Sequence, residues 1–181
     1  MHDWIKVLIS TFVGFFGGVA AEPVKLLLAS QLHRRTFRKS VYAELVVVSG
    51  RMAALVQYSK TQPTPEALAW GLRTFDLSPI TLDVFEHYYT AERPLLYSVS
   101  EAPWFIHIHR MVKHVNQVPE ENAIEKVCEI RKALEHIYSL AERGSLQSKV
   151  LSDNAREWRA TDHNLSTAGV PGRSRAVAVK R

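Results

Sequence analysis

Residues 4–21 read WIKVLISTFVGFFGGVAA, and Lys6 is the only charged residue in this stretch. An α-helix rises about 1.5 Å per residue, so about 20 such residues cover roughly 30 Å, the thickness of the hydrocarbon core of a bilayer. Trp4 suits one membrane interface, and the charged residues and proline that follow Ala21 suit the other. The sequence therefore predicts a transmembrane helix from Trp4 to Ala21, within an anchor and interface segment that covers residues 1–30.

Two other interpretations of this stretch are open: a cleaved signal peptide and a buried helix of a soluble protein. The small residues 19–21 form a pattern that a signal peptidase accepts, but the preceding segment is short and nearly neutral, whereas a basic cluster follows and opposes export. Gly14, Gly17 and Gly18 would each cost about 1 kcal/mol relative to alanine in a soluble helix, and glycine is more common in membrane helices. An uncleaved span is the favoured interpretation.

Basic residues predict the orientation of this span. Lys6 alone precedes the apolar run, whereas five basic residues follow it: Lys25, Arg34, Arg35, Arg38 and Lys39. Positively charged flanks stay on the cytoplasmic side, so we expect the N-terminus outside and the C-terminus in the cytoplasm, at the cell inner (plasma) membrane. A single cysteine, Cys128, excludes an internal disulfide and agrees with a reducing compartment.

The same five basic residues predict a partner. They lie in or beside a juxtamembrane segment, residues 31–40, where each basic residue is worth about 1 kcal/mol of attraction to anionic lipid headgroups. Nucleic-acid binding is not expected, because aromatic interleaving and a groove-reading helix are missing from the basic run.

Small residues recur on one face of the predicted span. Ser10, Gly14 and Gly18 are spaced four residues apart, so they share a helical face that contains a GxxxG motif. Such a face lets two helices approach closely within lipid. It favours a homodimer hypothesis, although glycine is frequent in membrane helices for other reasons as well.

Beyond the anchor, the pattern predicts a small all-α bundle over residues 41–148. Val41, Leu45, Val48, Met52 and Leu55 are spaced 4, 3, 4, 3, which predicts a helix continuing from the membrane to about Lys60.

Start and stop signals divide the remainder of that domain. Thr64–Pro65 predicts a helix to about Leu72, Ser78–Pro79 a helix over about 79–92 that ends before Pro94, and Ser100–Pro103 a further helix. The last predicted helix runs from Pro119 to Gly144, and its apolar stripe comprises Ile124, Val127, Cys128, Leu134, Ile137, Tyr138 and Ala141. From residue 149 to 181 large apolar residues are few, which predicts a disordered basic tail in which Trp158 docks locally.

Motifs for catalysis and cofactor binding are absent from the sequence. Neither phosphate-binding glycine motif occurs, nor does a G-x-S-x-G elbow, and Cys128 fits a small buried residue better than a nucleophile. His107 and His114 share a helical face and are weak candidates for a metal or acid–base site, but the Glu-x-x-His and H-E-x-x-H patterns are missing. We therefore expect no cofactor, and we favour a binding protein over an enzyme.

This layout of an anchor, a basic run and a small helical domain is typical of a bacterial inner-membrane protein. The leading hypothesis is a single-pass, membrane-anchored interaction or scaffold module with a cytoplasmic protein partner. Two alternatives stay open: an enzyme or metal-dependent effector with a site around His107, His114, Trp104, Tyr88 and Tyr89, and a membrane-perturbing effector formed by self-associated spans.

Overall fold

The computed structural model describes the backbone of residues 3–62, 64–74 and 80–168, and the side chains of Trp4, Thr11 and most residues from 22 to 161. This part of the chain contains helices and no strand, which confirms the all-α expectation. Its elements are α1 (Asp3–Thr61), α2 (Pro65–Thr74), α3 (Asp83–Ala91), α4 (Arg93–Leu96), α5 (Ala102–Gln117), the 3₁₀ turn η1 (Glu120–Asn122), α6 (Ala123–Glu142) and α7 (Lys149–Ala168).

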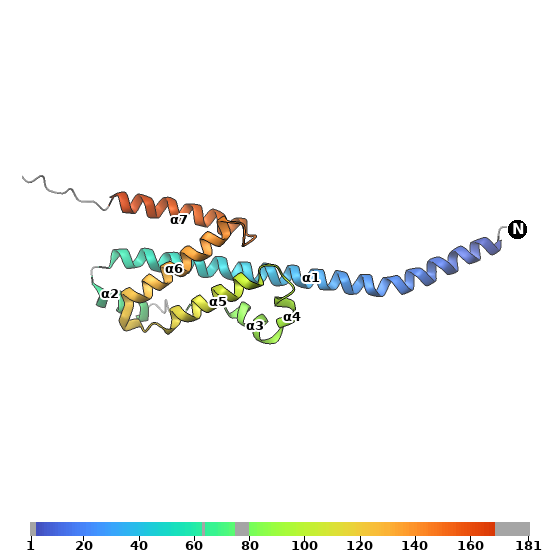
Figure 1. Ribbon diagram of the computed structural model, residues 1–181, viewed down its shortest axis with the longest axis horizontal. Coiled ribbons are helices and arrows are strands. Elements are labelled where there is room, and N and C mark those ends of the chain that lie inside the picture. Colours follow the sequence, from blue (N-terminus) through green and yellow to red (C-terminus); the bar gives the residue numbers. More distant parts are fainter. Residues whose placement is uncertain (1–2, 63, 75–79, 169–181) are drawn as a thin grey trace, which may run out of the picture.

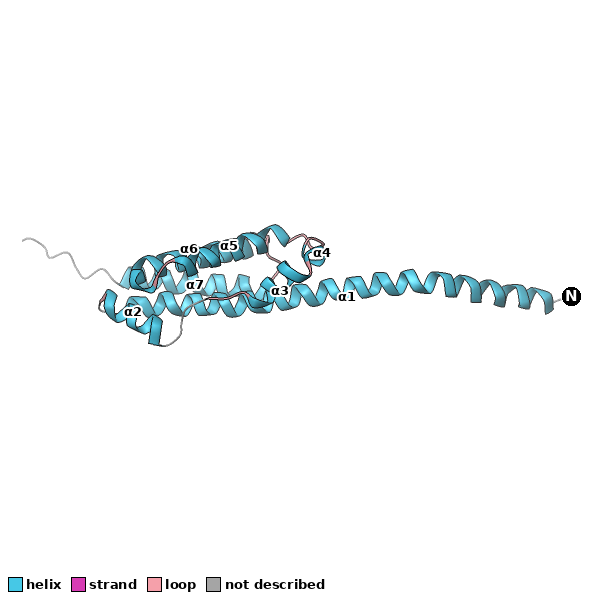
Figure 2. Cartoon of the chain, turned by 90° about the horizontal axis from the view of Figure 1, so that it is seen from below, coloured by secondary structure: helices cyan, strands magenta, loops and turns pink. Residues whose placement is uncertain are grey.

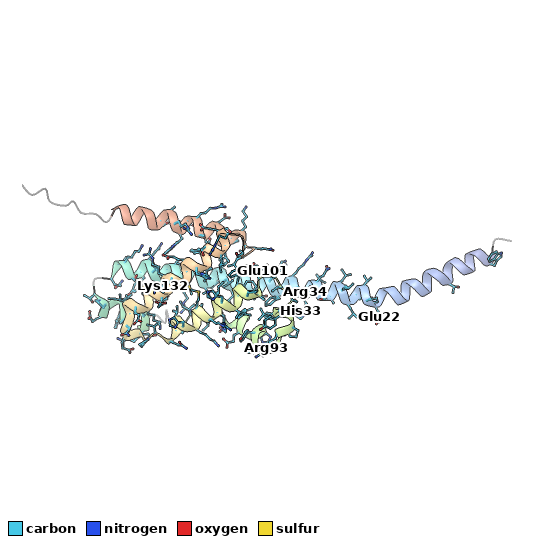
Figure 3. All side chains as sticks on the ribbon, in the orientation of Figure 1. Glu22, His33, Arg34, Arg93, Glu101 and Lys132 are labelled. Atoms are coloured by element: carbon cyan, nitrogen blue, oxygen red, sulfur yellow. The ribbon has the colours of Figure 1, made fainter. Side chains whose placement is uncertain are left out.

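Helix α1 is 59 residues long, and only its C-terminal half belongs to the bundle. Its N-terminal half projects away from the other helices as a single rod (Figure 1). Pro23 lies inside the helix, where it removes one backbone hydrogen bond, and α1 bends near Glu22 without ending (Figure 3). The stripe predicted from Val41 to Leu55 is confirmed, since each of its five side chains is at most 6% exposed.

Helix α6 is the centre of the bundle. It packs against α1, α2, α5 and α7, and α5 and α6 lie alongside the C-terminal half of α1 (Figure 2). The core between them contains Phe37, Leu45, Met52, Phe105 and Leu134, each at most 1% exposed. Helices α3 and α4 close the end of the bundle from which α1 projects (Figure 1).

Three of the predicted helix boundaries are confirmed. Thr64 caps α2, because its Oγ1 accepts the amide N–H of Ala67 at 3.2 Å. Helix α5 begins at Ala102 with a proline in its first turn. Gly144 has a φ of 74°, and the amides of the next two residues donate to the carbonyl of Leu140, which ends α6 as predicted.

The helix predicted to start at Pro79 begins later, at Asp83, and residues 75–79 lie outside the described part. The cap of this helix comes from a distant element: the carboxylate of Glu44 on α1 accepts the amides of Val84 and Phe85 at 2.7 and 2.9 Å. Just before it, Asn116 of α5 binds both backbone groups of Ile80, at 3.1 and 2.6 Å. These two long-range contacts fix the start of α3, and a local sequence signal does not.

The predicted disordered tail is wrong over residues 149–168, which form α7, while residues 169–181 lie outside the described part. Leu151, Ala155 and Trp158 are spaced 4 and 3 and are at most 8% exposed. Trp158 docks on Tyr138 of α6, with ring centroids 6.4 Å apart, as expected for that residue. Among its described side chains, this short stripe is the apolar anchor of α7 on the bundle.

Two residues of the stripe predicted for α6 lie outside it. Ile124 is 63% exposed and Cys128 is exposed as well. The buried stripe follows Ala123, Val127, Ile130, Leu134, Ile137 and Ala141. Ile124 and Cys128 each follow a stripe residue by one position, a rotation of about 100° about the helix axis that turns them to solvent.

Candidate functional site

The exposed segment of α1 from residue 22 to 36, here called the stalk, carries unusual apolar surface. Leu26, Leu27 and Leu28 are 69%, 64% and 55% exposed, and Leu32 is 61% exposed. Consecutive residues point about 100° apart on a helix, so this leucine run is apolar on several sides at once. A helix on the surface of a soluble bundle carries one apolar stripe, which the stalk does not have.

The predicted span lies on the continuation of the stalk. Its residues 4–21 belong to α1, but the side chains of Ser10, Gly14, Gly18 and Ala21 lie outside the described part; Trp4 is 60% exposed. Among the described residues, none of the helices is both long enough and apolar enough to cross a membrane.

The basic residues gather where α1 leaves the bundle, and the structure separates their environments. Figure 3 shows His33, Arg34 and Glu101 at this end of the molecule. Lys25, Arg34, Arg35 and Lys39 are exposed, and His33 Nε2 lies 3.3 Å from a carboxylate oxygen of Glu92. Arg38 differs from them, because its guanidinium pairs with the carboxylate of Glu101 at 2.8 Å.

Glu101 is the buried charge of this site, with its side chain 2% exposed. Its Oε2 also accepts the Ser100 hydroxyl at 2.9 Å, and the Tyr42 hydroxyl lies 3.4 Å from Oε1. A buried carboxylate is tolerated only when it is paired and hydrogen-bonded, so Arg38 balances the charge of Glu101 within the fold. The Nε of Arg38 is itself buried without a hydrogen-bond partner.

Tyr42 links three parts of the chain at this point. Its hydroxyl accepts the amide of Gln147 at 2.7 Å, in the connection between α6 and α7, and its ring meets Phe105 edge-on. Burial, together with the nearby Glu101 carboxylate, raises the pKa of Tyr42 to about 12, so the phenol stays neutral at physiological pH.

A cleft of about 450 Å³ opens beside this network. Its lining comprises Arg35, Arg38, Lys39, Tyr42, Glu101, Gln147, Ser148 and Lys149. Four of these side chains are basic and one is acidic, so the cleft has a positive charge excess. Lys149 is the first residue of α7, the helix that the sequence did not predict, and Ser148 directly precedes it.

The histidines are divided between two faces of α5. The ring of His107 lies against that of His136 on α6, with centroids 4.8 Å apart, whereas His109 is buried and its Nε2 lies 3.0 Å from Glu86. Tyr89 contacts the ring of His109 and does not join the His107 side. The residues of the hypothetical enzyme site therefore do not form one cluster.

The weak metal candidates His107 and His114 share a shallow cleft of about 310 Å³ with Glu129. Among the described residues, groups of three or more histidine, cysteine, aspartate or glutamate side chains that could hold a metal are not found. The Nε2 of His136 is buried without a partner, and burial, together with His107 and Arg143, lowers the pKa of His136.

Comparisons with known proteins give no further assignment: family models, curated proteins and solved structures yield no match to the chain.

Sequence reasoning missed the acidic and C-terminal half of the candidate site. Glu101 stood at a helix start and was expected only to open α5, and Lys149 was placed in a disordered tail. The sequence offers one indication of the site, Tyr42, a polar aromatic residue next to the buried stripe of α1. Its presence alone does not predict which residues it contacts.

Proposed function

We propose that the chain is a single-pass, membrane-anchored interaction or scaffold protein. Residues 4–21 cross the inner membrane with the N-terminus outside, and the helical bundle is held on the cytoplasmic side for a protein partner. The observation that carries this proposal is the stalk, in which four leucines are at least 55% exposed on a helix that the bundle does not cover.

Exposed leucines on several sides of a helix need a non-aqueous or protein environment, because burying each one is worth about 1.5–3 kcal/mol. The lipid bilayer satisfies such a helix on all sides at once, whereas one partner helix covers a single face. The stalk also continues directly into the apolar residues 4–21. These two features support lipid as the environment.

The charge distribution supports the orientation and a second contact with lipid. Arg34, Arg35 and Lys39 are exposed just beyond Leu32, the last leucine of the stalk. Basic side chains at this distance from apolar residues reach anionic headgroups on the cytoplasmic side. Arg38 contributes less to this contact, because Glu101 already neutralises it.

Topology reporters and a carbonate wash test the anchor. Cytoplasm-active and export-active reporters are fused in turn to the C-terminus, and membranes are washed with alkaline carbonate. We expect an uncleaved protein that resists the wash and is active only with the cytoplasmic reporter. Cleavage after Ala21, or release by carbonate, would refute the anchor.

Self-association through the span has its own test. We expect Gly14→Leu to abolish association in a membrane two-hybrid assay, because a bulky side chain on the Ser10–Gly14–Gly18 face holds two helices apart. Phe16→Leu is the matched control, since Phe16 lies about 160° away from Gly14 on the helix. Unchanged association in Gly14→Leu would refute the homodimer.

A further inference from the structure

The cleft between α1 and the start of α7 has the composition of a phosphate-binding site. Arg35, Arg38 and Lys39 line it from α1, and Lys149 lines it from α7. Arginine and lysine are the side chains that bind phosphate oxygens most often, through charge-assisted hydrogen bonds. Their convergence in one hollow of about 450 Å³ distinguishes this place from a basic surface in general.

The start of α7 adds to the positive potential. Helix α7 is 20 residues long, and its first residue Lys149 and the preceding Ser148 both line the cleft. Ser148 already caps one amide, since its Oγ accepts the N–H of Leu151 at 3.4 Å. The remaining first-turn amides and the helix dipole favour an anion at this end.

The single acid of the cleft does not cancel this potential. Glu101 is 2% exposed and its Oε2 is occupied by Arg38 and Ser100, at 2.8 and 2.9 Å. The exposed cations Arg35, Lys39 and Lys149 have no such carboxylate beside them in the cleft lining. An incoming anion would therefore meet three cations that no carboxylate of the cleft lining neutralises.

We propose that this cleft binds a phosphate group, either that of an anionic lipid headgroup or that of a small soluble phosphate compound. The cleft begins three residues beyond Leu32 of the stalk, about 5 Å along the helix axis, so a headgroup lies within reach if the stalk enters the membrane. The lipid form of the proposal rests on the proposed function, and the soluble form does not.

The test uses the full chain in neutral detergent, titrated with inorganic phosphate at constant ionic strength, with binding followed by calorimetry. We expect saturable binding that Arg35→Gln and Lys149→Gln each weaken about tenfold, the loss expected for one charge-assisted hydrogen bond. Arg156→Gln is the matched control, because Arg156 is an exposed arginine of α7 that does not line the cleft. It should bind phosphate as the unchanged chain does.

A second arm separates the two sources of phosphate. The chain is placed in nanodiscs of phosphatidylcholine alone or with phosphatidylglycerol, and the phosphate titration is repeated. Loss of phosphate binding only in the discs that contain phosphatidylglycerol would identify the headgroup as the occupant, and equal binding in both would identify a soluble phosphate compound. No saturable binding of phosphate in detergent or in either disc, or equal weakening by Arg156→Gln and Arg35→Gln, would overturn the proposal. Because the detergent arm needs no membrane insertion, a failed anchor leaves it interpretable.

Discussion

At the scale of single residues, the ion pair between Arg38 and Glu101 leads to a testable prediction about the free energy of unfolding. Glu101 is almost fully buried, so removing its cation leaves a buried charge without compensation. We expect Arg38→Met to lower the free energy of unfolding by about 2–4 kcal/mol, measured by urea denaturation. Glu101→Gln should cost less, because the amide keeps a hydrogen-bonding oxygen for Ser100 and Tyr42.

A double-mutant cycle decides whether this loss belongs to the pair. The two changes together should cost clearly less than the sum of the single losses, because the second change removes the charge that the first one isolated. Additive losses would show that Arg38 stabilises the bundle through its packing and not through Glu101.

The next prediction concerns His136 and the pH dependence of the unfolding free energy. Its pKa is lowered below the ordinary value of histidine, first by burial and then by His107 and Arg143. The unfolded chain therefore takes up a proton before the folded chain does, so this residue lowers stability as the pH falls below about 6.5 and has no effect well above it. We expect His136→Gln to flatten the decline in unfolding free energy between about pH 7 and pH 5.

The control for His136 is His87→Gln, since His87 is exposed and belongs to α3. That variant should keep the pH dependence of the unchanged chain. A His136→Gln profile parallel to that of the unchanged chain would contradict the assigned pKa shift.

At the scale of elements, α3 depends on a cap that another helix provides. The Glu44 carboxylate binds the amides of Val84 and Phe85, and capping side chains are worth about 1–2 kcal/mol. Glu44→Ala should speed amide hydrogen exchange in α3 and lower the unfolding free energy by that amount, while Glu44→Gln retains part of the cap. Glu66→Ala, which removes an exposed first-turn acid of α2, should leave exchange in α3 unchanged; equal exchange in Glu44→Ala and the unchanged chain would refute the cap.

Helix α3 also illustrates which features of the fold the sequence predicts and which it does not. Local signals placed α2, α5 and the end of α6 correctly, because Thr64, the Ala102–Pro103 start and Gly144 act within one turn of the chain. The start of α3 depends on Glu44, 40 residues away, and no periodicity encodes that contact. Helix α7 was not predicted because its buried stripe among the described residues, Leu151, Ala155 and Trp158, is short. The same holds for the candidate site. Its cations on α1 were predicted from the sequence, whereas their neighbours Glu101 and Lys149, which come from distant parts of the chain, were not.

At the scale of the whole molecule, the stalk and the bundle are separable by their packing. Leu26, Leu27, Leu28 and Leu32 are all more than half exposed, whereas Phe37, the first core residue of α1, is fully buried. The described side chains from residue 22 to 32 therefore add no packing energy to the bundle. A chain that lacks residues 1–32 should unfold within about 2 °C of the full chain, because a change below about 0.5 kcal/mol shifts the midpoint of a domain of this size only slightly.

A truncation six residues deeper provides the matched control. Removing residues 1–38 deletes Phe37 and Arg38, which leaves a core cavity and isolates Glu101. We expect this chain to unfold at least 10 °C lower or to fail to fold, as followed by circular dichroism, whereas the chain starting at residue 33 stays folded and leaves the membrane fraction. A large drop in the midpoint on removing residues 1–32 would mean that the stalk is packed against the bundle or a second copy of it, and the leucines would then be interface residues and not a path into lipid.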